Sequence, residues 1–233
     1  MANIDIKQGD CYKLIKSLPD NSIDLIITDP PYLLVPKGGG SFMKTRKYVD
    51  EIEPMKNGVD TNMLDQMCRV MKKNNIYLFC SRMQIPVFYN YFVNKQNCNW
   101  DLLEWHKTNP VPACNNKYLS DTEYIFFARE KGVKIKGNYH TKSTYFVTPV
   151  NKKDKKLYGH PTVKPTSIID NLVINSCPEN GTILDPFMGS GSTGVSALNN
   201  NCNFIGYEIE EKYFNTAKKR LNDTQKMLKN NVD

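Results

Sequence analysis

The chain has 233 residues and a formal net charge of +7, a length that suits one α/β domain with a substantial core and is short for two. It contains no run of about 18 apolar residues, so we expect no membrane span, and its N-terminus lacks the basic and apolar blocks of a secretion signal. Its seven cysteines form no Cys-x-x-Cys pair, which favours reduced thiols in a cytoplasmic protein and predicts no metal site.

The first predicted elements lead into a Pro-Pro motif. Asp10 can cap a short helix that ends near Pro19. Residues 23–28 predict a buried strand because they are apolar and rich in β-branched side chains. The motif Asp29-Pro30-Pro31-Tyr32 follows directly. Its prolines end the strand and hold the carbonyls of Asp29 and Pro30 stiffly beside a carboxylate and an aromatic ring.

Ligands of open α/β sheets bind at the carboxyl ends of strands, so this cluster of acceptors suits a planar amine. The alternative is an ordinary Pro-Pro turn with an incidental Asp29 and Tyr32. Residues 33–60 form a connection of a length that is uncommon unless it is functional or disordered. We expect it to close over a substrate as a flap rather than to be an idle surface loop.

The middle of the chain predicts further strands and helices before a basic segment. A helix capped by Asp60 or Thr61 is expected to place its methionines in the core. Residues 130–159 are rich in lysine and aromatic side chains, which suits a phosphate backbone, with a solvated loop as the alternative. The other expected elements are strands at 76–80, 100–106 and 122–128 and a helix around 87–93.

A second motif lies between two strands near the C-terminus. A strand at 181–185 precedes Pro186-Phe187-Met188-Gly189-Ser190-Gly191-Ser192-Thr193-Gly194, and after a helix the strand at 203–207 ends in Glu208. In such a unit the glycines let a ligand approach the backbone, and the acid about 20 residues on binds ribose hydroxyls. A last helix is expected from Glu211 to Leu228.

The glycine spacing also fits a dinucleotide fingerprint, so a nicotinamide cofactor is an alternative. Asp185 at the strand end would repel a pyrophosphate. Ser190, Ser192 and Thr193 supply hydroxyls and helix-start N–H groups that match a carboxylate better. A P-loop is excluded because no Gly-Lys-Ser/Thr follows the glycines.

Together, Asp-Pro-Pro-Tyr at 29–32 and Asp-Pro-Phe-Met-Gly-Ser-Gly-Ser-Thr at 185–193 resemble the S-adenosylmethionine-dependent DNA amino-methyltransferases, and their order is similar to that of the beta group, of the restriction-modification or phage type. The resemblance implies an α/β, Rossmann-like methyltransferase fold with a circularly shifted motif order. It implies a mixed seven-stranded sheet with one antiparallel strand near its edge and helices on both faces. We expect a single methyltransferase domain at 1–233, with a catalytic half (1–129), a small target-recognition insert (130–159) and a cofactor-binding half (160–233).

The resemblance also implies roles for single residues. The segment from His160 to Pro165 resembles the one that wraps the methionine end of the cofactor, and Gly9-Asp10-Cys11 resembles the one that contacts its adenine ring. The catalytic residues are Asp29, Pro30, Pro31 and Tyr32. The cofactor-binding residues are Asp10, Cys11, Asp29, Lys164, Pro165, Asp185, Phe187, Gly189, Ser190, Gly191, Ser192, Thr193 and Glu208. The predicted DNA contacts are Lys37, Lys44, Arg46, Lys47, Lys136, His140, Lys142, Lys152 and Lys153.

One turn departs from the family pattern. Lys72-Lys73-Asn74-Asn75 stands where Pro-Gly-Gly is common, and we expect asparagine to serve there because it tolerates left-handed backbone geometry.

The expected reaction is methyl transfer from S-adenosylmethionine to the N6 amine of a flipped adenine in double-stranded DNA, at a specific site. Asp29 and the Pro30 carbonyl would accept hydrogen bonds from the amine, and Tyr32 would stack on the base. Asp before Pro-Pro-Tyr resembles the adenine enzymes more than the cytosine-N4 enzymes, which are the first alternative. An RNA or protein amide methyltransferase, an NAD-binding oxidoreductase and an inactive DNA-binding homologue are the others. The resemblance leaves a homodimer and a companion restriction endonuclease open.

Overall fold

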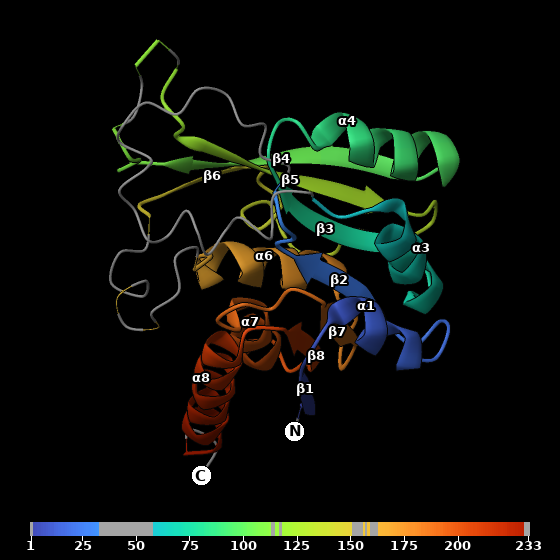
Figure 1. Ribbon diagram of the computed structural model, residues 1–233, viewed down its shortest axis with the longest axis vertical. Helices are drawn as coiled ribbons and strands as arrows, with labels where there is room; N and C mark the ends of the chain where they lie inside the picture. Colours follow the sequence, from blue (N-terminus) through green and yellow to red (C-terminus); the bar gives the residue numbers. More distant parts are fainter. Residues whose placement is uncertain are drawn as a thin grey trace.

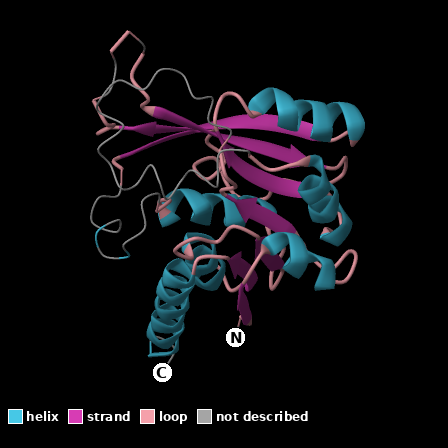
Figure 2. Cartoon of the chain, viewed as in Figure 1, coloured by secondary structure: helices cyan, strands magenta, loops and turns pink. Residues whose placement is uncertain are grey.

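The fold is built on one twisted sheet with helices packed on both of its faces (Figures 1 and 2). The computed structural model describes residues 2–32, 58–112, 115–116, 118–150, 156, 158 and 163–230. Most of the expected flap, with Lys37, Lys44, Arg46 and Lys47, lies outside the described residues, as do Lys152 and Lys153.

The elements alternate between strands and helices along the chain, as an α/β fold requires. In order they are β1 (Ile4–Gln8), α1 (Cys11–Leu14), the 3₁₀ turn η1 (Ile15–Ser17), β2 (Leu25–Thr28), α3 (Thr61–Val70), β3 (Asn75–Cys80), α4 (Ile85–Phe88), its π-helical continuation η3 (Tyr89–Lys95), β4 (Asn99–Lys107), β5 (Thr122–Arg129), β6 (Tyr145–Thr148), α6 (Thr166–Ser176), β7 (Thr182–Asp185), α7 (Ser192–Asn199), β8 (Asn203–Glu208) and α8 (Glu211–Asn230). All six strands predicted individually are present, with ends that differ by at most two residues.

The sheet has eight strands in the order β1-β8-β7-β2-β3-β5-β4-β6, so the expected count of seven is wrong. The additional edge strand, β6, comes from inside the lysine-rich segment 130–159 and pairs parallel with β4. Tyr145-Phe146-Val147 is a short aromatic and β-branched run that suits a strand despite its basic surroundings. The expected antiparallel strand is confirmed: β5 runs antiparallel to both β3 and β4.

Side chains of the central strands alternate between two hydrophobic cores. On β2, Ile26 packs on the face covered by α1, α3, α4 and η3, whereas Leu25 and Ile27 pack on the face covered by α6, α7 and α8 (Figure 1). Both faces of these strands are buried, which explains their nearly continuous apolar sequence. Among the helices, α6 is not predicted from the sequence, although Ile168, Ile169, Leu172 and Val173 follow a helical period.

The turn before β3 does not use left-handed asparagine. Neither Asn74 nor Asn75 has a positive φ, so that expectation is wrong. Asn75 instead begins β3 and is buried, and its Nδ2 donates to the carbonyls of Asp24 at 3.0 Å and Ser176 at 2.9 Å. The side chain thus ties the start of β3 to the start of β2 and to the end of α6.

The parallel strands β1, β8, β7 and β2 all end at the same edge of the sheet. Asp10, Glu208, Asp185 and Asp29 stand at or just after these strand ends. The fold therefore gathers the two sequence motifs, more than 150 residues apart, at one edge. No helix in the described ranges is long and apolar enough to cross a bilayer.

Candidate active site

Asp29 lies where β2 leaves the sheet, next to the end of β7. The preceding residue, Thr28, donates its hydroxyl to Asp185 Oδ1 at 2.6 Å, so the two motifs are in direct contact. Gln84 Nε2 donates to the Pro31 carbonyl at 3.1 Å and fixes the path of the chain beyond the prolines. These contacts hold the predicted catalytic motif on the sheet edge.

A network of charged side chains surrounds Asp29. The Lys164 ammonium group contacts Asp29 Oδ2 and lies 2.9 Å from Glu123 Oε1. The Tyr32 hydroxyl donates to the same Glu123 oxygen at 2.7 Å, and Lys107 Nζ lies 2.6 Å from Glu123 Oε2. The network joins the loop after β2, the end of β4, the start of β5 and the residues before α6. Its two acids and two lysines balance in charge.

Burial and neighbouring charges compete in this network. Burial raises the pKa of Asp29, Lys164 opposes that rise, and the Glu123 charge adds to it. Burial alone would also raise the pKa of Glu123, but Lys164 and Lys107 lower it to about 2. Burial and the two carboxylates raise the pKa of the Tyr32 hydroxyl, so this hydroxyl stays protonated as a donor. Glu123 is therefore firmly ionised, whereas burial opposes the ionisation of Asp29.

Asp29 also keeps one unused acceptor. Its Oδ1 is buried and has no hydrogen-bond partner among the residues that the structure describes. Buried polar atoms are nearly always paired in folded proteins. An unpaired carboxylate oxygen at the end of a central strand therefore suits a donor brought by a ligand.

Glu208 forms the other end of the site, where β8 ends beside β1. Its two carboxylate oxygens accept from the amides of Gly189 at 2.9 Å and Glu210 at 2.8 Å. Its carbonyl accepts from the Gly9 amide at 2.8 Å, so it also links the glycine turn to the end of β1. Burial raises the pKa of Glu208, and the bonded amides oppose that rise.

The glycine turn between β7 and α7 has the conformation that its sequence predicts. Gly189 and Gly191 have φ of 50° and 79°, values that favour glycine. A Cβ on Gly194 would lie 2.7 Å from side-chain atoms of Leu221 and Phe204, so this glycine allows α7 to pack closely. Arg220 Nη1 donates to Ser192 Oγ at 3.0 Å, which engages that hydroxyl within the protein.

Asp185 is a buried acid between the two motifs. Its Oδ1 accepts from the Thr28 hydroxyl and, at 3.1 Å, from the Phe187 amide. Burial nevertheless raises its pKa to about 7. A cation bound beside Asp185 would stabilise its ionised form.

The remaining predicted residues fall into two groups. Asp10 caps α1, with its side chain accepting from the Tyr12 amide at 2.9 Å, and Cys11 is buried beside it. Pro165 is the N-cap residue directly before α6. Of the predicted DNA contacts, Lys136, His140 and Lys142 are exposed in the segment before β6. Their roles stay predictions.

Two residues of the charged network, Glu123 and Lys107, are not among the predicted site residues. They lie on neighbouring antiparallel strands, β5 and β4, near the ends that meet. A weak signal is present for Glu123, because it directly precedes the apolar run of β5, but Lys107 is one of several polar residues of β4. Their pairing with each other and the contact of Glu123 with Lys164 depend on strand register and on the packing of α6, which the sequence pattern does not specify.

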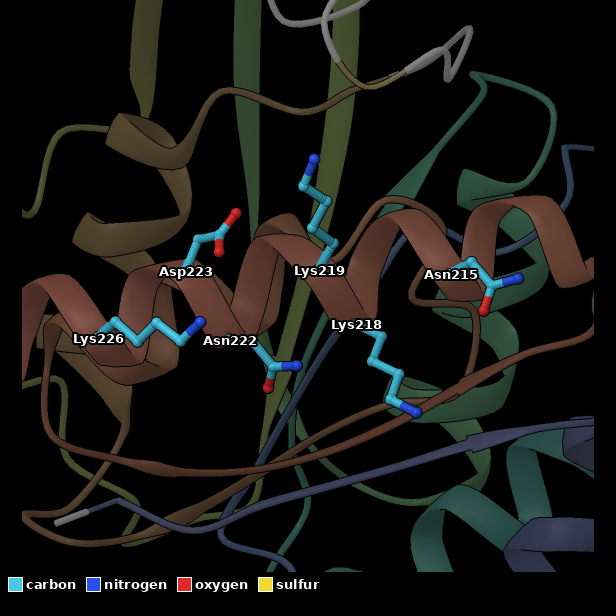
Figure 3. Close-up of a pocket in the computed structure, with 6 residues that line it drawn as sticks. All are labelled: Asn215, Lys218, Lys219, Asn222, Asp223 and Lys226. Carbon is cyan, nitrogen blue, oxygen red and sulfur yellow. The ribbon is translucent and has the colours of Figure 1, made fainter.

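A surface depression lies along α8 (Figure 3). The side chains that line it all project from this one helix: Asn215, Lys218, Lys219, Asn222, Asp223 and Lys226. It contains none of the predicted site residues, so the strand-end edge is the better candidate site.

Comparison with known proteins identifies the family. A family model described as DNA methylase, of the N6 and N4 methyltransferases, matches residues 23–219. The chain belongs to this DNA methylase family. The match includes both motifs. It therefore argues against the two alternative classes, an NAD-binding oxidoreductase and an RNA or protein amide methyltransferase.

Relatives match this DNA methylase over nearly its whole length. The Type II methyltransferase M2.LlaDCHI of Lactococcus lactis subsp. cremoris is 31% identical, over 94% of this chain and 90% of the relative. The Type II methyltransferase M2.MboI of Moraxella bovis is 29% identical, over 98% and 91%.

Solved structures agree in fold. The M1.HpyAVI–SAM complex has a TM-score of 0.71 and 28% identity, over 94% of this chain and 99% of the other. The PvuII DNA methyltransferase, described as cytosine-N4-specific, has a TM-score of 0.70 over 96% and 92%. Its identity is 16%, so this likeness shows the fold alone. The Rossmann-like methyltransferase fold expected from the motifs is confirmed.

Proposed function

We propose that this DNA methylase transfers a methyl group from S-adenosylmethionine to the exocyclic N6 amine of an adenine flipped out of double-stranded DNA. The observation that carries the proposal is the Asp29 carboxylate at the end of β2, with Oδ1 buried and unpaired among the described residues. The relatives named as Type II methyltransferases support a DNA substrate. The solved SAM complex of a similar chain supports the cofactor.

The residues at the edge fit S-adenosylmethionine better than a dinucleotide. Asp185 and Glu208 are acids at the neighbouring ends of β7 and β8, a pair that favours a cationic ligand and disfavours a pyrophosphate. Glu208 is oriented by two backbone amides, and we assign it the ribose hydroxyls. Asp185, with its pKa raised to about 7 by burial, suits a neighbouring cationic group. Asp10, Cys11 and the glycine turn complete the proposed cofactor edge.

The protein's part in the chemistry is to orient the amine. The lone pair of an exocyclic base amine is delocalised into the ring, so the nitrogen is a weak nucleophile. Hydrogen bonds from its N–H groups to Asp29 Oδ1 and to the Pro30 carbonyl would concentrate electron density on nitrogen and aim it at the methyl group. Bound S-adenosylmethionine supplies that methyl group on a positively charged sulfur. Direct displacement then requires mainly positioning and electrostatics.

Asp29 also provides a place for the released proton. When the nitrogen gains a methyl group it must lose one proton to become neutral again. Asp29 Oδ1, as the acceptor of one N–H bond, is the group we assign to receive it. The raised pKa of Asp29 favours that transfer.

Tyr32 is the proposed stacking partner of the flipped base. Its hydroxyl is fixed by Glu123 and its ring lies 5.6 Å from the Lys164 ammonium group. Base extrusion costs a few kcal/mol, and stacking on an aromatic ring returns about 1–3 kcal/mol per base. Exposed Lys136, His140 and Lys142 are proposed to contact the DNA backbone. A homodimer, a companion restriction endonuclease and a cytoplasmic location stay predictions from the sequence.

The assignment to adenine rests on Asp29, the residue directly before Pro-Pro-Tyr, because an aspartate there resembles the adenine enzymes more than the cytosine-N4 enzymes. The test is methylation of unmethylated duplex DNA by the purified protein with S-adenosylmethionine, followed by digestion and mass spectrometry of the nucleosides. We expect N6-methyladenine. N4-methylcytosine would keep the mechanism and overturn the base assignment, whereas the absence of any methylated nucleoside, despite measured cofactor binding, would overturn the proposed activity.

A further inference from the structure

Lys164, which the sequence resemblance assigns to the methionine end of the cofactor, contacts the catalytic motif directly. It is a buried lysine, 7% exposed, and its ammonium group contacts Asp29 Oδ2 and Glu123 Oε1. The ammonium group also lies 5.6 Å from the centre of the Tyr32 ring and 5.2 Å from that of Phe79. Lys164 is thus enclosed by the catalytic motif and two aromatic rings.

The contact with Lys164 determines which oxygen of Asp29 is available. Oδ2 is held by the ammonium group, while Oδ1 is buried and unpaired within the described part of the chain. A carboxylate fixed through one oxygen cannot rotate freely to offer the other in several directions. Lys164 therefore sets the direction in which Asp29 can accept a hydrogen bond.

Glu123 fixes Lys164 in turn. Its Oε1 lies 2.9 Å from Lys164 Nζ and accepts from the Tyr32 hydroxyl at 2.7 Å, while its Oε2 pairs with Lys107 at 2.6 Å. Both oxygens are thus engaged, and the side chain is only 10% exposed. One carboxylate holds both the lysine that orients Asp29 and the ring proposed to stack on the base.

We propose that Lys164 and Glu123 are positioning residues for the methyl-accepting amine. Lys164 holds the Asp29 carboxylate so that Oδ1 is left for the amine, and Glu123 fixes the positions of Lys164 and Tyr32 relative to each other. This inference rests on the proposed function, because it takes Asp29 as the group that accepts the amine.

The two residues act on Asp29 with opposite charges. Lys164 favours the ionised form of Asp29, and Glu123 disfavours it. Neutralising Lys164 should therefore raise the pKa of Asp29, and neutralising Glu123 should lower it. The titratable and charged groups that face Asp29, directly or through Glu123, are Lys164, Glu123, Tyr32, Lys107, Asp185 and Cys80.

The test measures kcat/KM for DNA against pH in Lys164→Met and Glu123→Gln. We expect the acidic limb to move to higher pH in Lys164→Met, by about one pH unit or more, and to lower pH in Glu123→Gln. We expect kcat to fall roughly tenfold or more in both, because the amine is less well oriented. The dissociation constant of S-adenosylmethionine, measured by calorimetry, should change by less than about threefold in both variants.

Lys72→Met is the matched control. Lys72 pairs with Asp24 at 2.8 Å, just before β2 begins, so this variant removes a lysine–aspartate pair at the opposite end of the same strand. Its pH profile should equal that of the unmodified enzyme. If Lys164→Met does not fold, the two single variants Glu123→Gln and Lys164→Arg provide the test. Lys164→Arg keeps the positive charge and should leave the acidic limb of the pH profile unchanged.

A direct titration separates this inference from the proposed function. The carboxyl ¹³C resonance of Asp29 in the cofactor-free protein, assigned by its loss in Asp29→Asn, should show the same opposite shifts. In an enzyme that still methylates DNA, either of two results would overturn the positioning role. One is an unchanged pKa of Asp29 in the variants, and the other is a loss of cofactor affinity in Lys164→Met without a change in the pH profile. Shifted Asp29 in a protein that methylates no DNA would overturn the proposed function, and the positioning role with it.

Discussion

Asp29, Asp185 and Glu208 stand at neighbouring strand ends, but their surroundings differ. Asp29 faces a lysine, Glu208 accepts from two backbone amides, and Asp185 accepts from a hydroxyl and an amide. No cationic side chain among the residues that the structure describes pairs with Asp185. Burial raises the pKa of all three, and it raises that of Asp185 to about 7. A site prepared for a positively charged ligand has this property, because the ligand supplies the missing charge.

Replacement of Asp185 by asparagine should therefore stabilise the free protein. The pKa of Asp185 is raised from 3.8 to about 7 on folding, so its contribution to stability is complete below pH 3.8 and is lost as the pH rises through 7. The difference corresponds to at most about 4 kcal/mol. We expect Asp185→Asn to raise the free energy of unfolding by about 2 kcal/mol or more at pH 8.

Urea denaturation of both proteins at pH 8 and pH 5 checks this prediction. The gain should fall by at least half at pH 5, because the wild-type acid is then largely protonated in the folded state. S-adenosylmethionine should bind the variant more weakly at both pH values. An equal stability of the two proteins at pH 8 would contradict the assignment of Asp185 as a buried acid held for a cation.

The sequence identifies the residues of the site that belong to contiguous motifs. Asp29, Tyr32, Asp185 and Glu208 are found in this way, because each follows a strand whose pattern is clear. Glu123 is not found in this way, since it is a single acid at the start of a strand. Its proposed role depends on contacts with three residues from other segments, Lys107, Lys164 and Tyr32.

At the scale of elements, strands with a continuous apolar sequence are predicted even where they are short, as β2 and β7 are, whereas β1, β6 and α6 are not. β1 is five residues long, begins with alternating apolar and polar side chains, and pairs with β8 at the edge of the sheet. β6 is four residues long and lies in a lysine-rich segment. α6 directly follows the motif around Lys164, and its apolar residues, which follow a helical period, pack against the sheet.

The connection from α3 to β3 shows how a side chain can replace a family's usual turn sequence. Asn75 donates to two carbonyls from separate elements, those of Asp24 and Ser176. We expect Asn75→Ala to lower the free energy of unfolding by about 2 kcal/mol, because both acceptors lose a buried donor. Lys73→Ala is the control, since Lys73 is exposed in the same turn, and it should change stability by less than about 0.5 kcal/mol. Thermal and urea unfolding would measure both, and equal effects of the two changes would refute the tie through Asn75.

At the scale of the whole molecule, strand order brings together what the sequence separates. β7 and β8 from the C-terminal part lie between β1 and β2 from the N-terminal part. The expected catalytic half (1–129) and cofactor half (160–233) therefore share one sheet. We propose on this basis that the chain folds as one domain. The circular shift of the motifs is a shift along the chain only, because Asp29 and Asp185 meet through Thr28 as neighbours on adjacent strands.

The same arrangement separates two tasks across the sheet edge. β2 carries the group proposed to orient the amine, and β1, β8 and β7 carry the groups proposed to hold the cofactor. Because the tasks lie on different strands, single substitutions should separate them. The central claim is that Asp29 acts on the amine and Glu208 on the cofactor.

The most direct measurement compares Asp29→Ala with Glu208→Ala, with single-turnover methyl transfer to DNA and the dissociation constant of S-adenosylmethionine determined for each. We predict that Asp29→Ala lowers the rate of transfer on the order of 10²- to 10³-fold or more and leaves cofactor affinity within about threefold of the wild type. Glu208→Ala should weaken cofactor binding roughly tenfold or more, as expected when charge-assisted hydrogen bonds to the ligand are lost. Cofactor binding weakened to the same degree in both variants, or transfer retained in Asp29→Ala, would contradict the account.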